Sequence, residues 1–292
     1  MFQSILVQAL SGISSGMVLF LVASGMTLIF GTLRVANFAH GSFYMIAAYL
    51  SFTLTRWVGH GTWGFVVSLV VAPLIVALLG LVVERFLLRR IATRAHQYQL
   101  ILTYALTLIL ADAVKMIWGR DNFTVPRPGA LDGAFDIFGT PFPSYYALLI
   151  VVGAVIAVAL HLLITRTRFG KVLRASVADG QMVGALGIDV PRLYTGVFAL
   201  GAWLAGLGGA LAAPVGSISL GIDSSIIIEC FAVVIIGGVG SVGGALLGAL
   251  IIGVTKSVGI LFAPKLAIAF IFIALCAVLV LRPQGLLGRS TA

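Results

Sequence analysis

The chain has 292 residues, of which 61% are hydrophobic and 9% charged, and its mean hydropathy is +1.17. Soluble domains carry about a quarter charged residues, so this composition excludes a soluble globular protein and predicts an all-α polytopic membrane protein. The formal net charge of +9 does not indicate nucleic-acid binding. Most of the lysines and arginines lie in short connectors between apolar runs, where membrane proteins concentrate them.

Apolar segments follow one another along the whole chain. They cover residues 7–30, 41–55, 63–88, 98–118, 145–164, 194–213, 226–236, 244–260 and 266–281. A helix needs about 20 residues to cross the hydrocarbon core, so we predict eight or nine transmembrane segments in a single membrane domain, residues 1–292. Segment 226–236 is too short to cross as a helix and is predicted to be a half-helix or a re-entrant segment. The first residues lack the basic region of a secretory signal, so the first apolar segment is expected to be retained.

Positively charged residues mark the cytoplasmic side of the membrane. They cluster at 85–94 and 166–174, and with the N-terminus outside the same side receives Arg34, Arg192, Arg282 and Arg289. Cytoplasmic loops carry an excess of Lys and Arg, so residues 165–192 are predicted to be a cytoplasmic connector. Residues 119–144 contain four prolines and are predicted to be an ordered external loop. An eight-span arrangement with the N-terminus inside is the alternative.

Two glycine-rich stretches break the apolar sequence, GTLRVANFAHG at residues 31–41 and GGVGSVGG at residues 237–244. Broken helices beside a shared pathway occur in transporters built from two related halves, whereas glycines that only permit close helix packing are the alternative. Asn37 and His40 are expected to hydrogen-bond the backbone at the first break. The residues assigned to a pathway or a helix break are Asn37, His40, Gly41, Glu229, Gly237, Gly238, Gly240 and Gly243.

The cytoplasmic connector contains a second pattern. After a cationic amphipathic part, small and apolar residues recur at helical spacing until Gly187 ends the helix. A short helix cannot bury such a face alone, so the face is expected to dock into a groove on a partner; a helix lying on lipid headgroups is the alternative. The face consists of Ala178, Asp179, Met182, Val183, Ala185 and Leu186.

Three motifs, in order, carry a resemblance to a known family. They are NFAHG at 37–41 followed by FYMIAAY at 43–49, TRFGKVLRA at 167–175 with AD at 178–179 and GI at 187–188, and GGVGSVGGALLGA at 237–249. They resemble the permease subunits of ABC importers for branched-chain amino acids, in particular the LivH-like subunit, over nearly the whole chain. The chain departs from the family pattern at Ala178-Asp179-Gly180, where relatives often carry two adjacent acidic residues. The electrostatic part of the contact that couples this connector to the ATP-binding subunits of such an importer is therefore expected to be weaker or differently placed.

The resemblance implies a machine of several polypeptides. It implies a second permease subunit, either LivM-like or a copy of this chain, two ATP-binding subunits and a periplasmic solute-binding protein, all at a bacterial inner membrane. The docking face together with Gly187 and Ile188 would then couple this chain to the ATPase. No phosphate-binding G-x-x-x-x-G-K-[ST] loop occurs in the sequence, so ATP and Mg²⁺ are expected on partner subunits, and this chain is expected to need no cofactor of its own.

Acidic residues inside apolar segments are functional candidates by default, because a charge at membrane depth is costly. Glu229 is predicted either to line a pathway or to pair with a cation such as Lys256. Asp112 is predicted to pair with Lys115 or Arg120, and Glu84 to form a hydrated pair with Arg85. Neither a metal site nor a catalytic set is indicated, because the few candidate residues lie in different segments.

The resemblance leaves two further readings open. Within the family, urea or short amides are alternative substrates. From another class, an ion-gradient-driven secondary transporter or channel would use Glu229 or Asp112 directly.

Overall fold

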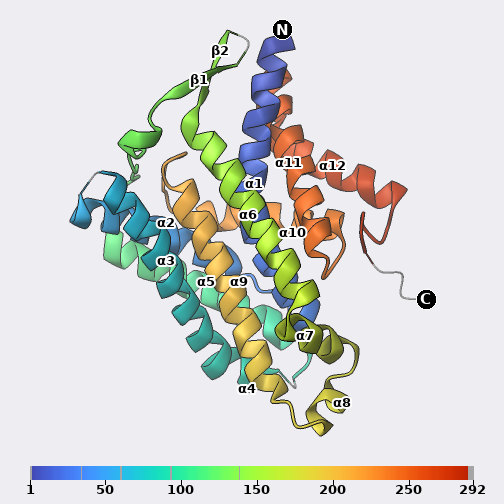
Figure 1. Cartoon of the computed structure of the whole chain (residues 1–292). Coiled ribbons are helices and arrows are strands. Elements are labelled where there is room, and N and C mark those ends of the chain that lie inside the picture. Colours follow the sequence, from blue (N-terminus) through green and yellow to red (C-terminus); the bar gives the residue numbers. More distant parts are fainter. Residues whose placement is uncertain (1, 34, 60, 93, 138, 289–292) are drawn as a thin grey trace.

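The computed structural model describes residues 2–33, 35–59, 61–92, 94–137 and 139–288. Arg34 and Arg289, which the charge pattern placed on the cytoplasmic side, lie outside the described residues. The described chain is mostly helical (Figure 1). Its longer helices are α1 (Phe2–Leu33), α2 (His40–Val58), α3 (Thr62–Val83), α5 (His96–Trp118), α6 (Ser144–Arg166), α9 (Val190–Ala212), α10 (Ile222–Gly237), α11 (Val242–Phe262) and α12 (Ala267–Leu281).

Each predicted apolar segment overlaps one of these helices, and their ends differ by up to five residues. Six described helices are long and apolar enough to cross a membrane, namely α1, α3 with its continuation, α5, α6, α9 and α11. Helix α10 has 16 residues and α12 has 15. At about 1.5 Å per residue both are shorter than a typical hydrocarbon core. The multi-pass all-α architecture is therefore confirmed, whereas the count of eight or nine spans is not.

Helix α3 continues into the cationic cluster at residues 85–94 without a break. A π-helical turn (Glu84–Leu88) and the short α4 (Arg89–Ile91) follow it directly. Such π-helical turns are rare, and they frequently mark functional sites. This one places Glu84 on the inner side of the helix, where the residue is buried.

Helices α1 and α9 form the centre of the molecule, and α1 also packs closely against α11. The close approach of α1 to α9 depends on glycine, because a Cβ on Gly25 would lie 2.5 Å from the carbonyl oxygen of Gly201. Small residues at such crossings let helix backbones touch, which is how helices associate in lipid. Around this crossing the buried side chains include Phe20, Phe43 and Phe198.

The loop at residues 119–144, predicted to be external, contains an element that the all-α prediction missed. Strands β1 (Ala134–Ile137) and β2 (Thr140–Pro143) form an antiparallel hairpin, with Phe135 paired to Phe142. Gly139, at the turn, has a φ of +79°, which glycine adopts without strain. A single two-stranded hairpin gives a weak sequence signal, since its strands have only four residues each.

The hairpin and the cytoplasmic connector lie at opposite ends of the molecule. Figure 1 shows the hairpin and the N-terminus at the top, and α7 (Arg168–Ala178) and α8 (Gly180–Ala185) at the bottom. The apolar helix α6, with 23 residues, joins the two ends. The predicted placement of residues 119–144 and 165–192 on opposite sides of the membrane agrees with this arrangement.

A segment after α12 returns to the end of α10. The backbone N–H of Leu286 donates to the carbonyl of Ile236 (2.8 Å), and that of Leu287 donates to the carbonyl of Gly237 (3.1 Å). The last carbonyls of a helix have no partner within the helix. The later segment therefore completes the hydrogen bonding of α10 at the second glycine-rich break.

Candidate functional site

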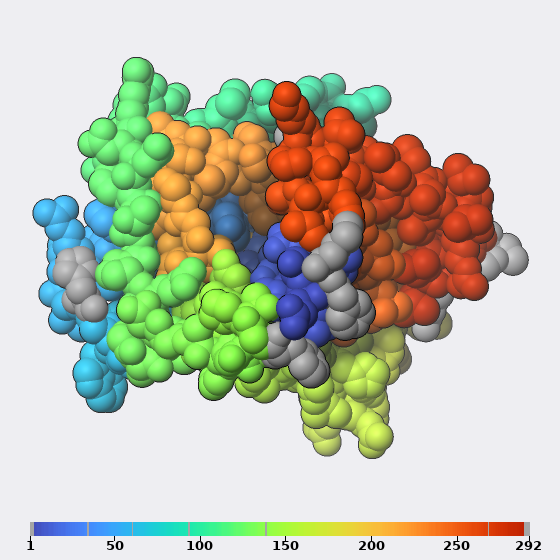
Figure 2. Space-filling model, turned by 90° about the horizontal axis from the view of Figure 1, so that it is seen from above, coloured from blue at the N-terminus to red at the C-terminus, as the bar shows by residue number. Residues whose placement is uncertain are grey.

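A cleft of about 530 Å³ lies beside the first half of α1. It opens toward the end that carries the N-terminus, and Figure 2, which looks onto this end, shows a recess next to α1. Its walls come from α1, α2, α6, α10 and α11 and from residues 212–217, where α9 ends. Segments from all parts of the chain thus converge on one cavity.

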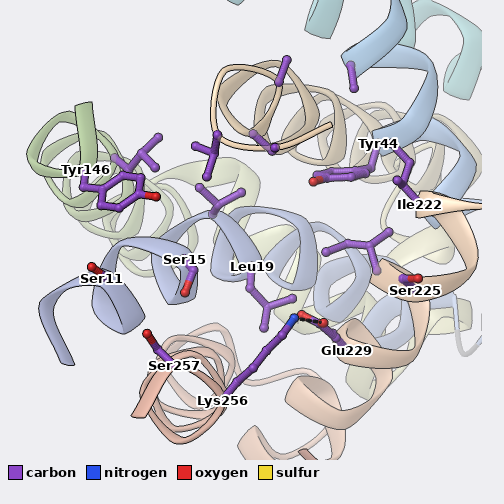
Figure 3. Close-up of a pocket in the computed structure, with 18 of the residues that line it drawn as sticks. Ser11, Ser15, Leu19, Tyr44, Tyr146, Ile222, Ser225, Glu229, Lys256 and Ser257 are labelled. Carbon is purple, nitrogen blue, oxygen red and sulfur yellow. Dashed lines mark hydrogen bonds and ion pairs between the residues drawn. The ribbon is translucent and has the colours of Figure 1, made fainter. Parts of the chain in front are cut away.

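An ion pair lies in the wall of this cleft. The Lys256 ammonium on α11 is 2.5 Å from the Glu229 carboxylate on α10 (Figure 3). The Lys256 side chain keeps 38% of its surface exposed and that of Glu229 keeps 17%. The sequence left two roles open for Glu229, and the structure shows both features, because the residue is paired with Lys256 and also lines the cavity.

The rest of the lining divides into polar and apolar parts. Aliphatic side chains face the cavity from α1, α6 and α10, and two tyrosines, Tyr44 and Tyr146, reach it from α2 and α6 (Figure 3). The hydroxyls are those of Ser11, Ser15, Ser217, Ser225 and Ser257. Sequence reasoning did not select these serines. The signal that was present is the spacing of Ser11 and Ser15, which places both on one face of α1.

At the opposite end, the connector folds into two helices and not one. Asp179 leaves the helical conformation (φ −151°, ψ 95°) and caps α8, its carboxylate accepting a hydrogen bond from the Met182 N–H (2.9 Å). Ala178 therefore ends α7, whereas the sequence placed it on the same helix as Leu186. Aspartate at this position favours a helix start, because its side chain satisfies a free N–H of the first turn.

Besides Ala178, which belongs to α7, the predicted docking face is corrected at Val183. Met182 and Leu186 are 60% and 73% exposed, and Ala185, Gly187 and Ile188 are exposed as well. Val183 is only 5% exposed, so it anchors α8 to the rest of the chain and is not available to a partner. Gly187 has a φ of +84° and ends the helical segment, as predicted.

The two glycine-rich breaks touch each other. A Cβ on Gly31, near the end of α1, would lie 2.6 Å from the Cα of Gly240, which has a φ of +78°. Gly237 packs equally closely on Gly244, and Gly238, with a φ of +93°, ends α10. Gly243 lies in the first turn of α11. These glycines permit close packing, as the alternative reading of the sequence held.

Asn37 bonds to backbone at the first break, as predicted, whereas His40 bonds to backbone in the middle of α1. The Asn37 side chain accepts a hydrogen bond from the Ala39 N–H (3.1 Å) just before α2. His40 is the first residue of α2, and its Nε2 lies 2.9 Å from the carbonyl oxygen of Val22 on α1. A Cβ on Gly41 would lie 2.3 Å from the carbonyl oxygen of Asp223, so the start of α2 also rests on α10. These residues hold the break in place but lie outside the lining of the cleft.

Comparison with known proteins assigns the chain to a family. The family model described as branched-chain amino acid transport system, permease component, matches residues 8–281. The chain belongs to this family. It is therefore a multi-pass permease protein of the inner membrane, in agreement with its apolar helices.

Relatives of this permease match it over almost their whole length. The high-affinity branched-chain amino acid transport system permease protein BraD of Pseudomonas aeruginosa is 32% identical, over 97% of this chain and 95% of the relative. The protein LivH of Escherichia coli K12 is 28% identical, over 99% and 97%. The probable LivH of Methanocaldococcus jannaschii is 30% identical, over 92% and 88%. No solved structure is significantly similar to the chain.

Two further acidic residues of the permease have defined partners. Asp112 lies 3.8 Å from Lys115 one turn later on α5, so the predicted pair is confirmed; both side chains are well exposed. The predicted hydrated pair of Glu84 with Arg85 is wrong. Glu84 is buried and its carboxylate accepts a hydrogen bond from the Thr195 hydroxyl on α9 (2.5 Å). Glu84 lies one turn after Gly80, which packs against Ala202 of α9, so it continues the buried face of α3 toward α9.

Replacing Thr195 with valine is expected to lower the thermal stability of the detergent-solubilised permease. A buried carboxylate that loses a hydrogen-bond donor destabilises a fold by about 1–3 kcal/mol. The matched control is Thr165→Val, because the Thr165 hydroxyl bonds only to the carbonyl of His161 in its own helix and is exposed. Equal melting temperatures for the two variants would show that the bond to Glu84 is unimportant.

Proposed function

We propose that the chain is one permease subunit of an ABC importer and that its cleft forms part of the path for branched-chain amino acids. The full-length similarity to BraD and LivH supports this proposal. The observation that carries it is the separation of two surfaces, since the cleft opens at one end of the membrane helices and the exposed α8 lies at the other. Solute entry and coupling to an engine then occur on opposite sides of the membrane.

Helix α7 is the proposed link between the engine and the helices. Leu173, Arg174 and Val177 on α7 line a second cavity, of about 340 Å³, together with α1 and the second glycine-rich break. Across this cavity lie Gly31 and Gly240, at the point where the two breaks touch. A shift of α7 would therefore reach a place where two helices end, and broken helices rearrange there more easily than continuous ones.

The partners follow from this division of labour. Two ATP-binding subunits, which hold ATP and Mg²⁺, dock on the surface formed by Met182, Ala185, Leu186, Gly187 and Ile188. A periplasmic solute-binding protein delivers the amino acid to the cleft, and a second permease subunit completes the path. The whole chain acts as one permease domain, with α2, α10 and α12 counted among eight or nine membrane segments and α10 entering only part of the bilayer.

Reconstitution in proteoliposomes tests this function. The permease pair with its ATPase and a leucine-loaded binding protein is expected to accumulate leucine only when ATP is present. Uptake by this chain alone, driven by a sodium or proton gradient, would instead show a secondary transporter. ATP-dependent uptake of urea or acetamide without uptake of leucine would show that the substrates are urea or short amides.

Changing Asp179 to lysine is expected to weaken coupling. Loss of an N-cap destabilises a helix by about 1 kcal/mol, and α8 has only six residues to hold its exposed face in place. Asp179→Asn is the matched control, because an amide oxygen can still accept the hydrogen bond from Met182. The measurement is leucine uptake per ATP hydrolysed, and an equal ratio in the two variants would remove the cap from the coupling mechanism.

A further inference from the structure

The ion pair between Glu229 and Lys256 lies in the wall of the cleft. Charges inside a membrane protein are stabilised by pairing, and those that face a cavity commonly mark the path of a solute. Here both residues face a cavity large enough for a small solute, and the Lys256 side chain keeps more than a third of its surface exposed. A solute in the cleft can therefore reach both charges.

The surroundings of the pair combine charged groups with an aliphatic surface, as a branched-chain amino acid does. Leu19 lies beside the pair and Ser225 one turn before Glu229 on α10 (Figure 3), and Ile222 and Ile226 line the same cavity from α10. Ser257 follows Lys256, and its hydroxyl is bonded to the carbonyl of Gln8. Charged groups thus lie next to an aliphatic surface, as the charged and aliphatic parts do in leucine, isoleucine and valine.

A zwitterion can replace each partner of this pair. Its ammonium can take the place of Lys256 at the Glu229 carboxylate, and its carboxylate can take the place of Glu229 at the Lys256 ammonium. All four charges then keep an opposite charge beside them, so the exchange leaves no charge unpaired in the cleft. A neutral amide offers no such exchange, and an amine or a carboxylate alone would satisfy only one half of the pair.

We propose that Glu229 and Lys256 are the recognition site for the ammonium and carboxylate groups of the transported amino acid. This proposal rests on the proposed function, since it takes the cleft to be the solute path. In the empty cleft, Glu229 and Lys256 then neutralise each other, and the bound solute takes the place of each partner. It also makes the cleft selective for zwitterions over urea or short amides.

A variant with neither charge separates recognition from structure. Glu229→Gln/Lys256→Met removes both charges together, and replacing an ion pair by neutral groups of similar size leaves no charge unpaired. In proteoliposomes with the full complex, leucine uptake per ATP hydrolysed is expected to fall at least about tenfold, which is the contribution of one charge-assisted hydrogen bond. The ATPase activity stimulated by leucine-loaded binding protein is expected to stay within about twofold of the wild type. Unchanged uptake per ATP in this variant would overturn the proposal.

The matched control is Asp112→Asn/Lys115→Met, which neutralises an exposed pair on α5 that lies outside the cleft lining. It is expected to transport like the wild type. Failure of the proposed function has a different signature, because the wild-type complex itself would then show no ATP-dependent uptake.

A measurement on the wild-type complex does not depend on any variant folding. Radiolabelled leucine is bound to the purified permease complex without ATP or binding protein, and unlabelled compounds compete for it. Leucine is expected to compete at least about tenfold better than 4-methylpentanoate or 3-methylbutylamine, each of which keeps one of the two charged groups. Equal competition by either compound would show that the cleft does not read both charges.

Discussion

Replacing Gly209 with valine is expected to prevent most of the permease from folding. A Cβ at this position would lie 2.2 Å from the carbonyl oxygen of Tyr44 on α2 and 3.1 Å from the Cβ of Ala47. The nearest obstacle is backbone, which cannot rotate out of the way, so α9 and α2 must move apart. Overpacking inside a well-packed core costs about 1–3 kcal/mol, or more where backbone must shift. The cleft would also be disturbed, because Tyr44 is part of its wall.

The measurement for Gly209→Val is the yield and melting temperature of monodisperse protein in detergent. Gly196→Val is the matched control in the same helix, because the nearest atom to a Cβ there, on Phe169, is 4.0 Å away. Both variants place valine in α9, so the difference between them reports on packing alone. Similar yields for the two would show that α2 and α9 separate without cost.

The second large effect is expected for Leu186→Asp. Leu186 is 73% exposed in the end of the connector assigned to the ATPase interface, and it contributes little to the folded chain. A carboxylate buried against a partner groove without a counter-charge is strongly unfavourable. We therefore expect the ATPase subunits to be lost on purification and ATP-driven leucine uptake to fall at least about tenfold, with normal membrane insertion.

Leu186→Met is the matched control, since it keeps an apolar side chain of similar volume. The two variants are compared by the amount of ATPase subunit that co-purifies and by leucine uptake. Full co-purification with Leu186→Asp would move the docking surface elsewhere on the cytoplasmic side. Val183→Asp would not be informative in this comparison, because Val183 is buried and its replacement would disturb α8 itself.

The helices could be predicted well from the sequence because membrane helices are recognised by their apolar composition. The backbone of a long apolar run must satisfy its hydrogen bonds internally in lipid, so it forms a helix. The polar stretches between the runs form the connectors. Helix α10 was predicted too short, at 226–236, because the apolar run begins after Asp223. The structure extends the helix to Ile222, and Asp223 is buried with its carboxylate near the Ser42 hydroxyl (3.4 Å). A charged residue with such a partner does not end a helix, but the partner is distant in the sequence.

The cleft could be predicted only in part for the same reason. Glu229 was selected because it is an acid at membrane depth, and Lys256 because it is the kind of cation that could pair with it. The serines and tyrosines of the lining are ordinary in apolar helices, and only the meeting of α1, α2, α6, α10 and α11 gives them a common cavity. Glu84 likewise has a partner, Thr195, that is distant in the sequence, so only the packing of α3 on α9 brings the two side chains together.

The hydrogen bonds that Leu286 and Leu287 donate to the end of α10 fix an order of events during synthesis. Helix α10 emerges from the ribosome well before these donors, and α11 and α12 must be made in between. The last carbonyls of α10 therefore have no partner until residues 286 and 287 are made. The second glycine-rich break, which contacts Gly31, acquires these hydrogen bonds late in folding. A truncation before Leu286 is for this reason expected to give a protein that inserts into the membrane but lacks the hydrogen bonds at the end of α10.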